Sequence, residues 1–435
     1  MSENIVVGLD IGTTKICAIV GSSDNHGNLN ILGVGKAPSE GLNRGVVTNI
    51  EKTVKSIQQA VEEAKHMSGL EIKSVTVGIA GDHIQSFQSR GVITIAGPHH
   101  EITENDVNRL LADTKKIALP SDRQIIHVIP QEFIVDGQDG VTDPIGMTGI
   151  RMEANVHIIT GLVTAIRNIE RCVEKAGLKV DDIVLEPIAS SLAVLTPEEK
   201  EVGVALLDIG GGTTDLAIFE EKTIRKTSVI AIAGKMVTDD IRKGLGILQE
   251  QAEQLKTEYG SAHMSEVFDD EPIIIPGISG RPPKEVGKGT LCQIIEPRMQ
   301  EIFEIVRDEI KASGYSKRLS AGLVITGGGS LVRGTATLAR EVIGMDVKIG
   351  IPGGLYGGVV DEVASPKYAT SVGLVIHSLK AGKGQQAISM KELNKIEDSL
   401  PETEKPKSKP EQKETGAKKG LTGFVEKAKG WFDEL

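Results

Sequence analysis

Gly8-Leu9-Asp10-Ile11-Gly12-Thr13-Thr14 and Leu207-Asp208-Ile209-Gly210-Gly211-Gly212-Thr213-Thr214 are the two stretches that decide the fold. Each places an Asp-x-Gly motif directly before a second apolar run, Ile16–Val20 in one case and Leu216–Phe219 in the other. Each stretch therefore predicts a strand, a tight glycine turn and a second strand. The shared order of Asp, Gly and Thr indicates a duplicated domain. The separation between the two stretches is far too long for a solenoid repeat. The alternative is two unrelated glycine hairpins.

Strand-like and helix-like segments alternate around these hairpins. Ile5–Leu9 and Val75–Ile79 have the composition of strands, and Ile50–Ala64 has apolar residues at helical spacing. Similar alternation runs from Val156 to Leu195 and from Val202 to Ile241. This pattern predicts an α/β fold with mixed sheets.

The composition bounds the class of protein. The chain has 435 residues, 39% hydrophobic and 25% charged, which is typical of a globular protein and excludes a collagen, a coiled coil or a fully disordered chain. No run approaches the ~18 apolar residues of a membrane-spanning helix, and the N-terminus has no signal-peptide pattern. Three widely spaced cysteines favour a reducing, cytoplasmic location. A net charge of −11 argues against general affinity for nucleic acid.

The glycine turns have the chemistry of a triphosphate site. Glycine lets backbone amides approach phosphate oxygens, and consecutive amides in turns form anion-binding nests. The candidate phosphate ligands are Gly12, Thr13, Thr14, Lys15, Gly210, Gly211, Gly212, Thr213 and Thr214. Asp10 and Asp208, at the strand ends, would hold Mg²⁺ through its water shell.

A third glycine turn follows the strand-like Leu323–Ile325. Its residues Gly327, Gly328, Gly329 and Ser330 would lie under the adenosine. On its own this turn is weak evidence, because any tight strand-to-helix turn favours glycine. The chain has no GxxxxGK[ST] sequence, which excludes a P-loop nucleotide hydrolase.

The C-terminal end changes character. Residues 384–420 are rich in Lys, Glu, Pro and Ser, and they predict a disordered linker. Residues 421–435 then predict an amphipathic helix that lies in a membrane interface. Its apolar face comprises Leu421, Phe424, Val425, Ala428, Trp431, Phe432 and Leu435. Two alternatives remain: the helix could fold back onto its own domain, or a partner protein could dock it.

The ordered set of hairpins resembles the actin superfamily of ATPases, which includes the heat-shock chaperone ATPases and the sugar kinases. Over nearly the whole chain the sequence resembles the FtsA family of bacterial cell-division proteins within that superfamily. The segments that carry this resemblance are Asp10–Lys15, Arg44–Ile50, Asp208–Asp215, Ile295–Arg298 and Leu421–Leu435.

The resemblance implies an actin-like ATPase fold of two duplicated domains around a nucleotide cleft. Its expected parts are 1–82 with 165–203 (subdomain 1A, with a last helix near 367–383), 83–164 (an inserted subdomain, 1C), 204–234 with 317–366 (subdomain 2A) and 235–316 (subdomain 2B). Within 1C we expect strands at Gly91–Gly97, His127–Ile134 and Val156–Ile159, and a helix over Glu104–Ala118.

Four further site residues are implied by the resemblance. Glu253 and Lys256 match the pair that contacts adenosine in the superfamily, although an exposed salt bridge would give the same spacing. Gly234 matches a turn near the ribose and phosphates, but Ala233 stands where a second glycine is common. Glu186 resembles a glutamate that positions the attacking water in MreB, and a structural role is the alternative.

The implied function is an ATP-binding protein that polymerises and tethers FtsZ filaments to the inner face of the cytoplasmic membrane at the division septum. ATP and Mg²⁺ would be its cofactors, with at most slow ATPase activity. Subdomain 1C would serve self-association and contact later division proteins. The acidic tail of FtsZ would dock on a groove formed by Arg281, Lys284, Arg298, Met299 and Ile302.

Two other functions fit the same fold. The first is a PilM-like adaptor that binds the peptide of a membrane partner, but such adaptors typically lack a linker and terminal amphipathic helix. The second is a sugar or acetate kinase, which needs a base aspartate in an acceptor cleft and has no use for the tail. The C-terminal segment therefore favours the tether.

Overall fold

The computed structural model describes residues 4–24, 28–97, 99–269, 271–382 and 385–386. All of them fall within Met1–Ser389, one of the two units into which the chain divides. The predicted membrane helix, and the predicted linker apart from Gln385 and Gln386, lie outside the described residues. Within the described part of the chain, no helix is long and apolar enough to cross a membrane.

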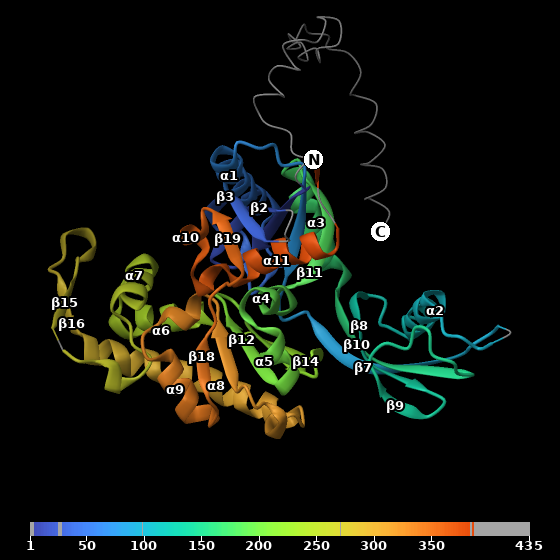
Figure 1. The fold of residues 1–435 in the computed structure, drawn as a ribbon. Coiled ribbons are helices and arrows are strands. Elements are labelled where there is room, and N and C mark those ends of the chain that lie inside the picture. Colours follow the sequence, from blue (N-terminus) through green and yellow to red (C-terminus); the bar gives the residue numbers. More distant parts are fainter. Residues whose placement is uncertain (1–3, 25–27, 98, 270, 383–384, 387–435) are drawn as a thin grey trace, which may run out of the picture. The chain divides into compact units, whose positions relative to one another are not determined.

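The first half of the described body is built on a seven-stranded mixed sheet. The strands run in the order β11–β6–β1–β2–β3–β19, and β20 pairs with β1 (Figure 1). β1 and β2 are antiparallel and almost wholly buried, as expected for a sheet covered on both faces. The strands are β1 (Asn4–Ile11), β2 (Lys15–Ser23), β3 (Leu29–Pro38), β6 (Ser74–Ile79), β11 (Lys179–Leu185), β19 (Leu355–Gly358) and β20 (Gln385–Gln386).

β20 extends the folded body into the segment predicted as linker. Gln385 lies opposite Ile5 and Gln386 opposite Asn4 in an antiparallel pair. The pairing needs only backbone groups, because β1 reaches beyond its neighbour β6 and offers free N–H and C=O groups there. Polar composition therefore gave no sign of this strand.

The second half repeats the topology of the first. β12 pairs antiparallel with β13 and parallel with β17, as β1 does with β2 and β6. Asp208 lies opposite Asp215, at the position that Asp10 and Cys17 occupy in the first hairpin. The predicted duplication is thus confirmed. The strands are β12 (Val204–Ile209), β13 (Thr214–Glu220), β14 (Thr223–Ile230), β17 (Leu323–Thr326) and β18 (Val347–Ile349).

Helices cover both sheets. α1 begins after Asn49, whose side chain accepts a hydrogen bond from the Lys52 amide, and it ends at Gly69 in the left-handed region. α4 and α11 lie against each other between the two sheets (Figure 1), where β1, β2, β12 and β13 contribute to one apolar core. The first-half helices are α1 (Ile50–Ser68), α3 (Val163–Lys175), α4 (Glu186–Val194), α5 (Pro197–Val202), α10 (Val360–Val363) and α11 (Ala369–Lys380).

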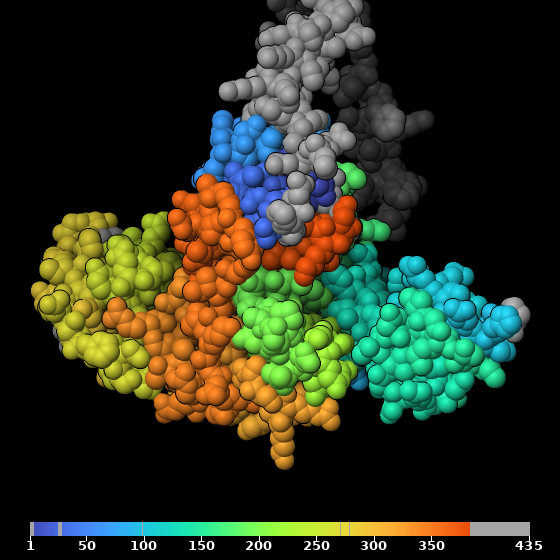
Figure 2. Space-filling view, in the orientation of Figure 1, coloured from blue at the N-terminus to red at the C-terminus, as the bar shows by residue number. Residues whose placement is uncertain are grey.

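The remaining helices belong to the second half. They are α6 (Gly234–Leu245), α7 (Gln249–Tyr259), α8 (Lys288–Ala312) and α9 (Thr335–Ile343), with 3₁₀ turns at Met264–Glu266, Ile278–Gly280, Ser316–Arg318, Gly328–Leu331 and Pro366–Tyr368. Short hairpins join β4 (Leu42–Asn43) to β5 (Val46–Val47) and β15 (Pro272–Ile275) to β16 (Lys284–Gly287). In Figure 2, residues 235–290 (yellow) and the segment 83–164 (cyan to teal) form separate surfaces of the described body.

The segment 83–164 folds as a four-stranded antiparallel sheet in the order β7–β10–β8–β9. Its elements are β7 (Gln85–Thr94), α2 (Glu104–Thr114), β8 (Arg123–Val135), β9 (Gln138–Val141) and β10 (Arg151–Leu162). β7 begins six residues before the predicted strand because all ten of its residues pair with β10, although most are exposed. α2 ends four residues before the predicted end, where Thr114 turns its hydroxyl onto the Leu111 carbonyl.

Polar contacts join this sheet to β14, the edge strand of the second-half sheet. The Ser86 hydroxyl donates to the Thr227 carbonyl at 2.9 Å, and Gln131 Nε2 donates to the Ile224 carbonyl at 2.8 Å. His157 Nε2 lies 3.0 Å from Thr227 Oγ1, and the histidine is 2% exposed. Burial lowers the pKa of His157 to about 4. The neutral ring is therefore the form that this contact holds.

The buried His157 predicts a specific loss of stability in acid. Below pH 6.5 the unfolded chain takes up a proton at this residue while the folded chain resists, so its contribution falls until about pH 4. The free energy of unfolding of wild type relative to His157→Gln should drop by about 3 kcal/mol over that window. Urea unfolding at a series of pH values measures it, with His66→Gln, on the exposed face of α1, as the control. A pH-independent difference would contradict the prediction.

Candidate functional site

A pocket of about 420 Å³ is lined by residues of both halves. Most of the residues predicted from the sequence meet there: Asp10, Gly12, Thr13, Thr14, Lys15, Glu186, Asp208, Gly210, Gly211, Gly212, Thr213, Gly234, Glu253, Lys256, Gly327, Gly328 and Gly329. Thr214 and Ser330 are not among the lining residues. The Thr214 hydroxyl donates to the Ile232 carbonyl and the Ser330 hydroxyl to the Gly327 carbonyl, so both stabilise the backbone beside the pocket.

The two hairpin turns touch across the pocket. A Cβ built on Gly211 would lie 2.8 Å from Thr14 Oγ1, and one built on Gly212 would lie 2.9 Å from Thr13 Cβ. Real side chains do not tolerate such distances. Glycine at these positions is therefore what allows the turns of the two halves to approach each other.

Four carboxylates converge behind the turns: Asp10, Glu186, Asp208 and Asp215. Burial raises the pKa of Asp208 to about 6, and burial together with the charge of Asp208 raises that of Asp215 to about 8. The pKa of Glu186 is also held well above its usual range, first by burial and then by the charges of Asp10, Asp215 and Asp208. Burial likewise raises the pKa of Asp10, against the charge of Lys15. Burial and mutual repulsion thus favour the protonated forms of these four carboxyl groups.

Asp215 was not predicted from the sequence as a site residue. Its Oδ2 accepts a hydrogen bond from Thr213 Oγ1 at 3.0 Å, while its buried Oδ1 has no hydrogen-bond partner among the described residues. A signal was present, because Asp215 follows the second glycine turn directly. The first hairpin has Cys17 at the equivalent position, so comparison of the two copies did not single out Asp215.

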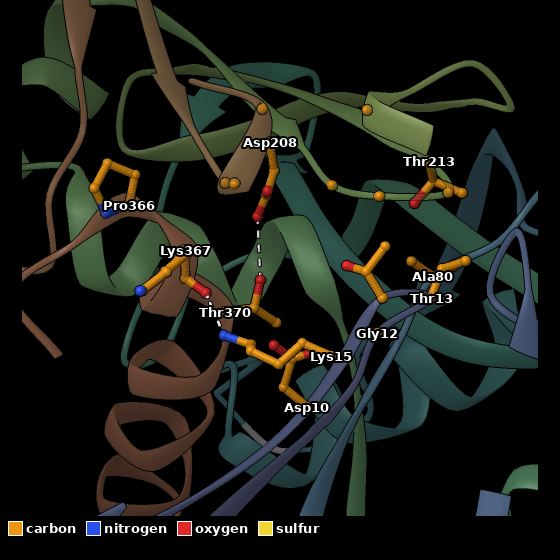
Figure 3. Close-up of a pocket in the computed structure, with 18 of the residues that line it drawn as sticks. Asp10, Gly12, Thr13, Lys15, Ala80, Asp208, Thr213, Pro366, Lys367 and Thr370 are labelled. Carbon is orange, nitrogen blue, oxygen red and sulfur yellow. Dashed lines mark hydrogen bonds between the residues drawn. The ribbon is translucent and has the colours of Figure 1, made fainter. Parts of the chain in front are cut away.

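Lys15 lies at one wall of the pocket, opposite Asp208 in Figure 3. Its Nζ donates to the Lys367 carbonyl at 2.8 Å and lies 4.1 Å from the centre of the Tyr368 ring. These contacts hold the positive charge at the end of the first turn. Pro366, Lys367 and Thr370 also line the pocket, and no local motif marked them in the sequence.

The ammonium group of Lys256 is hydrogen-bonded to three groups of the protein itself. Its Nζ donates to Gly234 O at 3.1 Å, to Thr238 Oγ1 at 2.9 Å and to Glu253 Oε2 at 2.7 Å. An ammonium has three donors, so all are taken. Lys256 therefore fixes the Gly234 turn and the Glu253 side chain. Both residues line the pocket, but Glu253, whose side chain is 46% exposed, is the more exposed of the two.

The described residues fit a hydrated magnesium ion better than a directly caged metal. Within the described ranges no group of three or more His, Cys, Asp or Glu side chains could hold a metal. Mg²⁺ usually keeps several waters and binds through one or two carboxylates plus substrate phosphates. Asp10 and Asp208, one from each half and both buried, match that requirement.

The predicted partner groove is wrong in its apolar part. Met299 and Ile302 are 1% and 0% exposed, because they lie on the face of α8 that packs into the second-half core. Arg298 is also engaged, since its Nε donates to Asp240 at 2.6 Å. Arg281 and Lys284 are exposed, and Lys284 Nζ donates to the Leu245 carbonyl. The five residues therefore do not form one groove.

The known proteins that are similar to this chain in sequence belong to one family. The family model "Cell division protein FtsA" matches residues 205–373, and "SHS2 domain inserted in FTSA" matches residues 81–160. Cell division protein FtsA of Pseudomonas aeruginosa is 44% identical over 389 residues, which cover 89% of this chain and 93% of that relative. FtsA of Bacillus subtilis is 38% identical over 374 residues, covering 86% of this chain and 83% of that relative.

Solved structures show the same fold at low identity. The PilM-PilN type IV pilus biogenesis complex matches with a TM-score of 0.64 and 16% identity, over 86% of this chain and 98% of that chain. MreB5 of Spiroplasma citri bound to ADP matches with a TM-score of 0.50 and 18% identity, over 91% of this chain and 99% of that chain. Likeness at this level of identity concerns the fold alone.

The duplicated sheets and the paired hairpins define an actin-like protein of the ATPase fold. Within that class, the chain belongs to the FtsA family of cell division proteins. The resemblance inferred from the hairpins and the tail is confirmed. The family assignment leaves the PilM-like adaptor and the small-molecule kinase without support.

Proposed function

We propose that this actin-like cell-division protein binds ATP with Mg²⁺ between its two halves. One observation carries the proposal: glycine turns from both halves face a single pocket and touch across it. The turn amides at Gly12–Lys15 and Gly210–Thr213 would bind the phosphates, and Asp10 and Asp208 would hold the hydrated ion. Bound Mg²⁺ would neutralise phosphate charge. The Gly327–Ser330 turn, Gly234 and Glu253 would then surround the adenosine.

Glu186 is proposed to position the attacking water for a slow hydrolysis. It stands at the first residue of α4, behind the hairpins and beside the other carboxylates. A general base typically contributes 100-fold or more to a rate. Replacement by glutamine keeps the size of the side chain and removes the base.

The variant Glu186→Gln should keep ATP affinity within about threefold and lose hydrolysis by about 100-fold or more. Binding is measured by anisotropy of a fluorescent ATP, and hydrolysis by phosphate release from the same preparation. Glu198→Gln, at an exposed position of α5, is the control. Hydrolysis that survives at the wild-type rate would remove Glu186 from the reaction and leave it a structural residue.

We further propose that the chain assembles into polymers and tethers FtsZ filaments to the inner face of the cytoplasmic membrane at the division site. Family membership and the amphipathic pattern of residues 421–435 support this role. One short helix binds lipid weakly, whereas many helices on one polymer bind by avidity. The segment 83–164 is proposed to serve self-association and contacts with later division proteins.

The FtsZ tail is proposed to bind the subdomain 235–316 at a surface that keeps Arg281 and Lys284 of the predicted groove but not its buried residues Met299 and Ile302. Phe268 is 82% exposed and Ile274, on β15, is 66% exposed. Large apolar side chains at such exposure mark candidate binding surfaces, and the exposed Arg281 and Lys284 add positive charge on the same subdomain. An acidic, partly apolar peptide suits that combination.

The tether is tested through Trp431, the only tryptophan in the chain. Its emission is recorded while liposomes are titrated, with and without ATP and Mg²⁺. The proposal expects a blue shift that grows with ATP and is absent from a chain truncated after Gly420. Emission that stays water-like at all lipid concentrations would contradict membrane attachment, and emission already blue without lipid would indicate docking on protein instead.

A further inference from the structure

Two neighbouring hydroxyls at the start of α11 each hold an aspartate of a different half. Thr370 Oγ1 donates to Asp208 Oδ2 at 3.1 Å, as the dashed line in Figure 3 shows. Ser371 Oγ donates to Asp10 Oδ2 at 3.0 Å. Thr370 is 8% exposed and Ser371 is 0% exposed, so little solvent reaches either hydroxyl. A hydrogen bond to a buried charged acceptor is among the stronger kinds in proteins.

The other side-chain hydrogen bonds that α11 makes to neighbouring elements go to the first half. The Ser371 carbonyl lies so close to Gly8 on β1 that a Cβ there would come within 2.8 Å of it. Near the other end of the helix, Ser378 Oγ donates to Thr76 Oγ1 at 2.6 Å, and His377 Nε2 lies 3.0 Å from Asp182 Oδ2. The Thr370 bond therefore reaches from a first-half helix to the carboxylate at the end of second-half strand β12.

The two hydroxyls also determine which carboxylate oxygen of each aspartate remains available to a ligand in the pocket. Both occupy Oδ2, and the other oxygen of each carboxylate lies on the side of a glycine turn. A Cβ on Gly12 would be 3.7 Å from Asp10 Oδ1, and a Cβ on Gly327 would clash with Asp208 Oδ1. The two Oδ1 atoms thus point toward the turns that line the pocket.

We propose that the hydroxyls of Thr370 and Ser371 position the aspartates of the two hairpins for one shared, hydrated divalent cation. The inference rests on the proposed function. It gives a role in cation binding to two residues of α11, which lie outside both glycine hairpins. Both are positioning residues, because they act through the carboxylates. The loss of one hydroxyl should weaken the cation-dependent part of nucleotide binding and leave the cation-independent part alone.

The test compares ATP affinity of the full chain in Mg²⁺ and in EDTA, by anisotropy of a fluorescent ATP. For Thr370→Val the gain in affinity on adding Mg²⁺ should fall about tenfold or more relative to wild type. Its affinity in EDTA should stay within about twofold of wild type. Ser371→Ala should behave in the same direction, and Thr370→Ser, which restores a hydroxyl, should recover most of the gain.

Ser378→Ala is the matched control, since it removes a buried hydroxyl of the same helix far from the pocket. It should keep the full Mg²⁺ gain, and circular dichroism verifies that each variant is folded. A full Mg²⁺ gain in Thr370→Val would overturn the inference, and so would an equal loss of affinity in Mg²⁺ and EDTA. A wild-type chain whose ATP binding shows no Mg²⁺ gain would refute the proposed cofactor itself, before any variant is compared.

Discussion

Replacing Gly212 by valine is expected to weaken ATP binding by about 100-fold or more, which corresponds to about 3 kcal/mol. Gly212 lies against Thr13 of the other hairpin. A Cβ built on Gly212 would lie 3.0 Å from the Cα of Arg44. A valine side chain must push the two turns apart, and their amides then no longer converge on one phosphate group. Each half keeps its own sheet, so the chain should still fold.

The matched control is Gly353→Val. Gly353 lies between β18 and β19, its φ is outside the left-handed region, and a Cβ there meets only the Ala193 carbonyl at 4.0 Å. The same substitution should therefore leave ATP affinity within about twofold of wild type. Fluorescent-ATP anisotropy measures both variants. Equal affinities for Gly212→Val and wild type would mean that the contact between the turns is irrelevant to binding.

Replacing Asp215 by asparagine is expected to stabilise the nucleotide-free protein by about 4 kcal/mol at pH 7. The pKa of Asp215 is raised to about 8 by burial and by the charge of Asp208, against an ordinary value of 3.8. An acid with a raised pKa costs stability as the pH rises from its ordinary value to its folded value. The cost therefore grows between about pH 4 and pH 8, and asparagine removes it.

The sign of this effect separates it from a simple loss of packing. The difference in unfolding free energy between Asp215→Asn and wild type should increase with pH, by about 3 kcal/mol from pH 5 to pH 7. Urea unfolding without nucleotide measures it, and Asp361→Asn, at an exposed position, serves as the control. A variant less stable than wild type at pH 7 would show that the ionised carboxylate is compensated within the protein.

Local sequence patterns predicted the hairpins well because all of their determinants lie within a few residues. Asp10 and Asp208 each precede a glycine turn and a second apolar strand, and the structure places them at equivalent positions of two sheets. The same reasoning could not find Thr370. Its partner Asp208 is 162 residues away in the sequence. No motif near Thr370 indicates that its side chain is buried and bonded to a carboxylate.

The partner groove shows a different limit. Ile295, Met299, Ile302 and Val306 follow helical spacing, which by itself indicates a buried face of α8. Family resemblance placed Met299 and Ile302 on a surface, although their own periodicity favoured the core. The pairing of Gln385 and Gln386 with β1 was missed because backbone groups carry it and side-chain composition leaves no trace of it.

If turns from both halves hold one nucleotide, hydrogen–deuterium exchange of the full chain should detect its contact with each turn. Exchange rates are compared with and without ATP and Mg²⁺. We expect slower exchange at Gly12–Lys15, at Gly210–Thr214 and at Gly327–Ser330, in the same titration and with the same midpoint. Protection confined to one hairpin, or absent from both at saturating ATP, would contradict binding by turns from both halves.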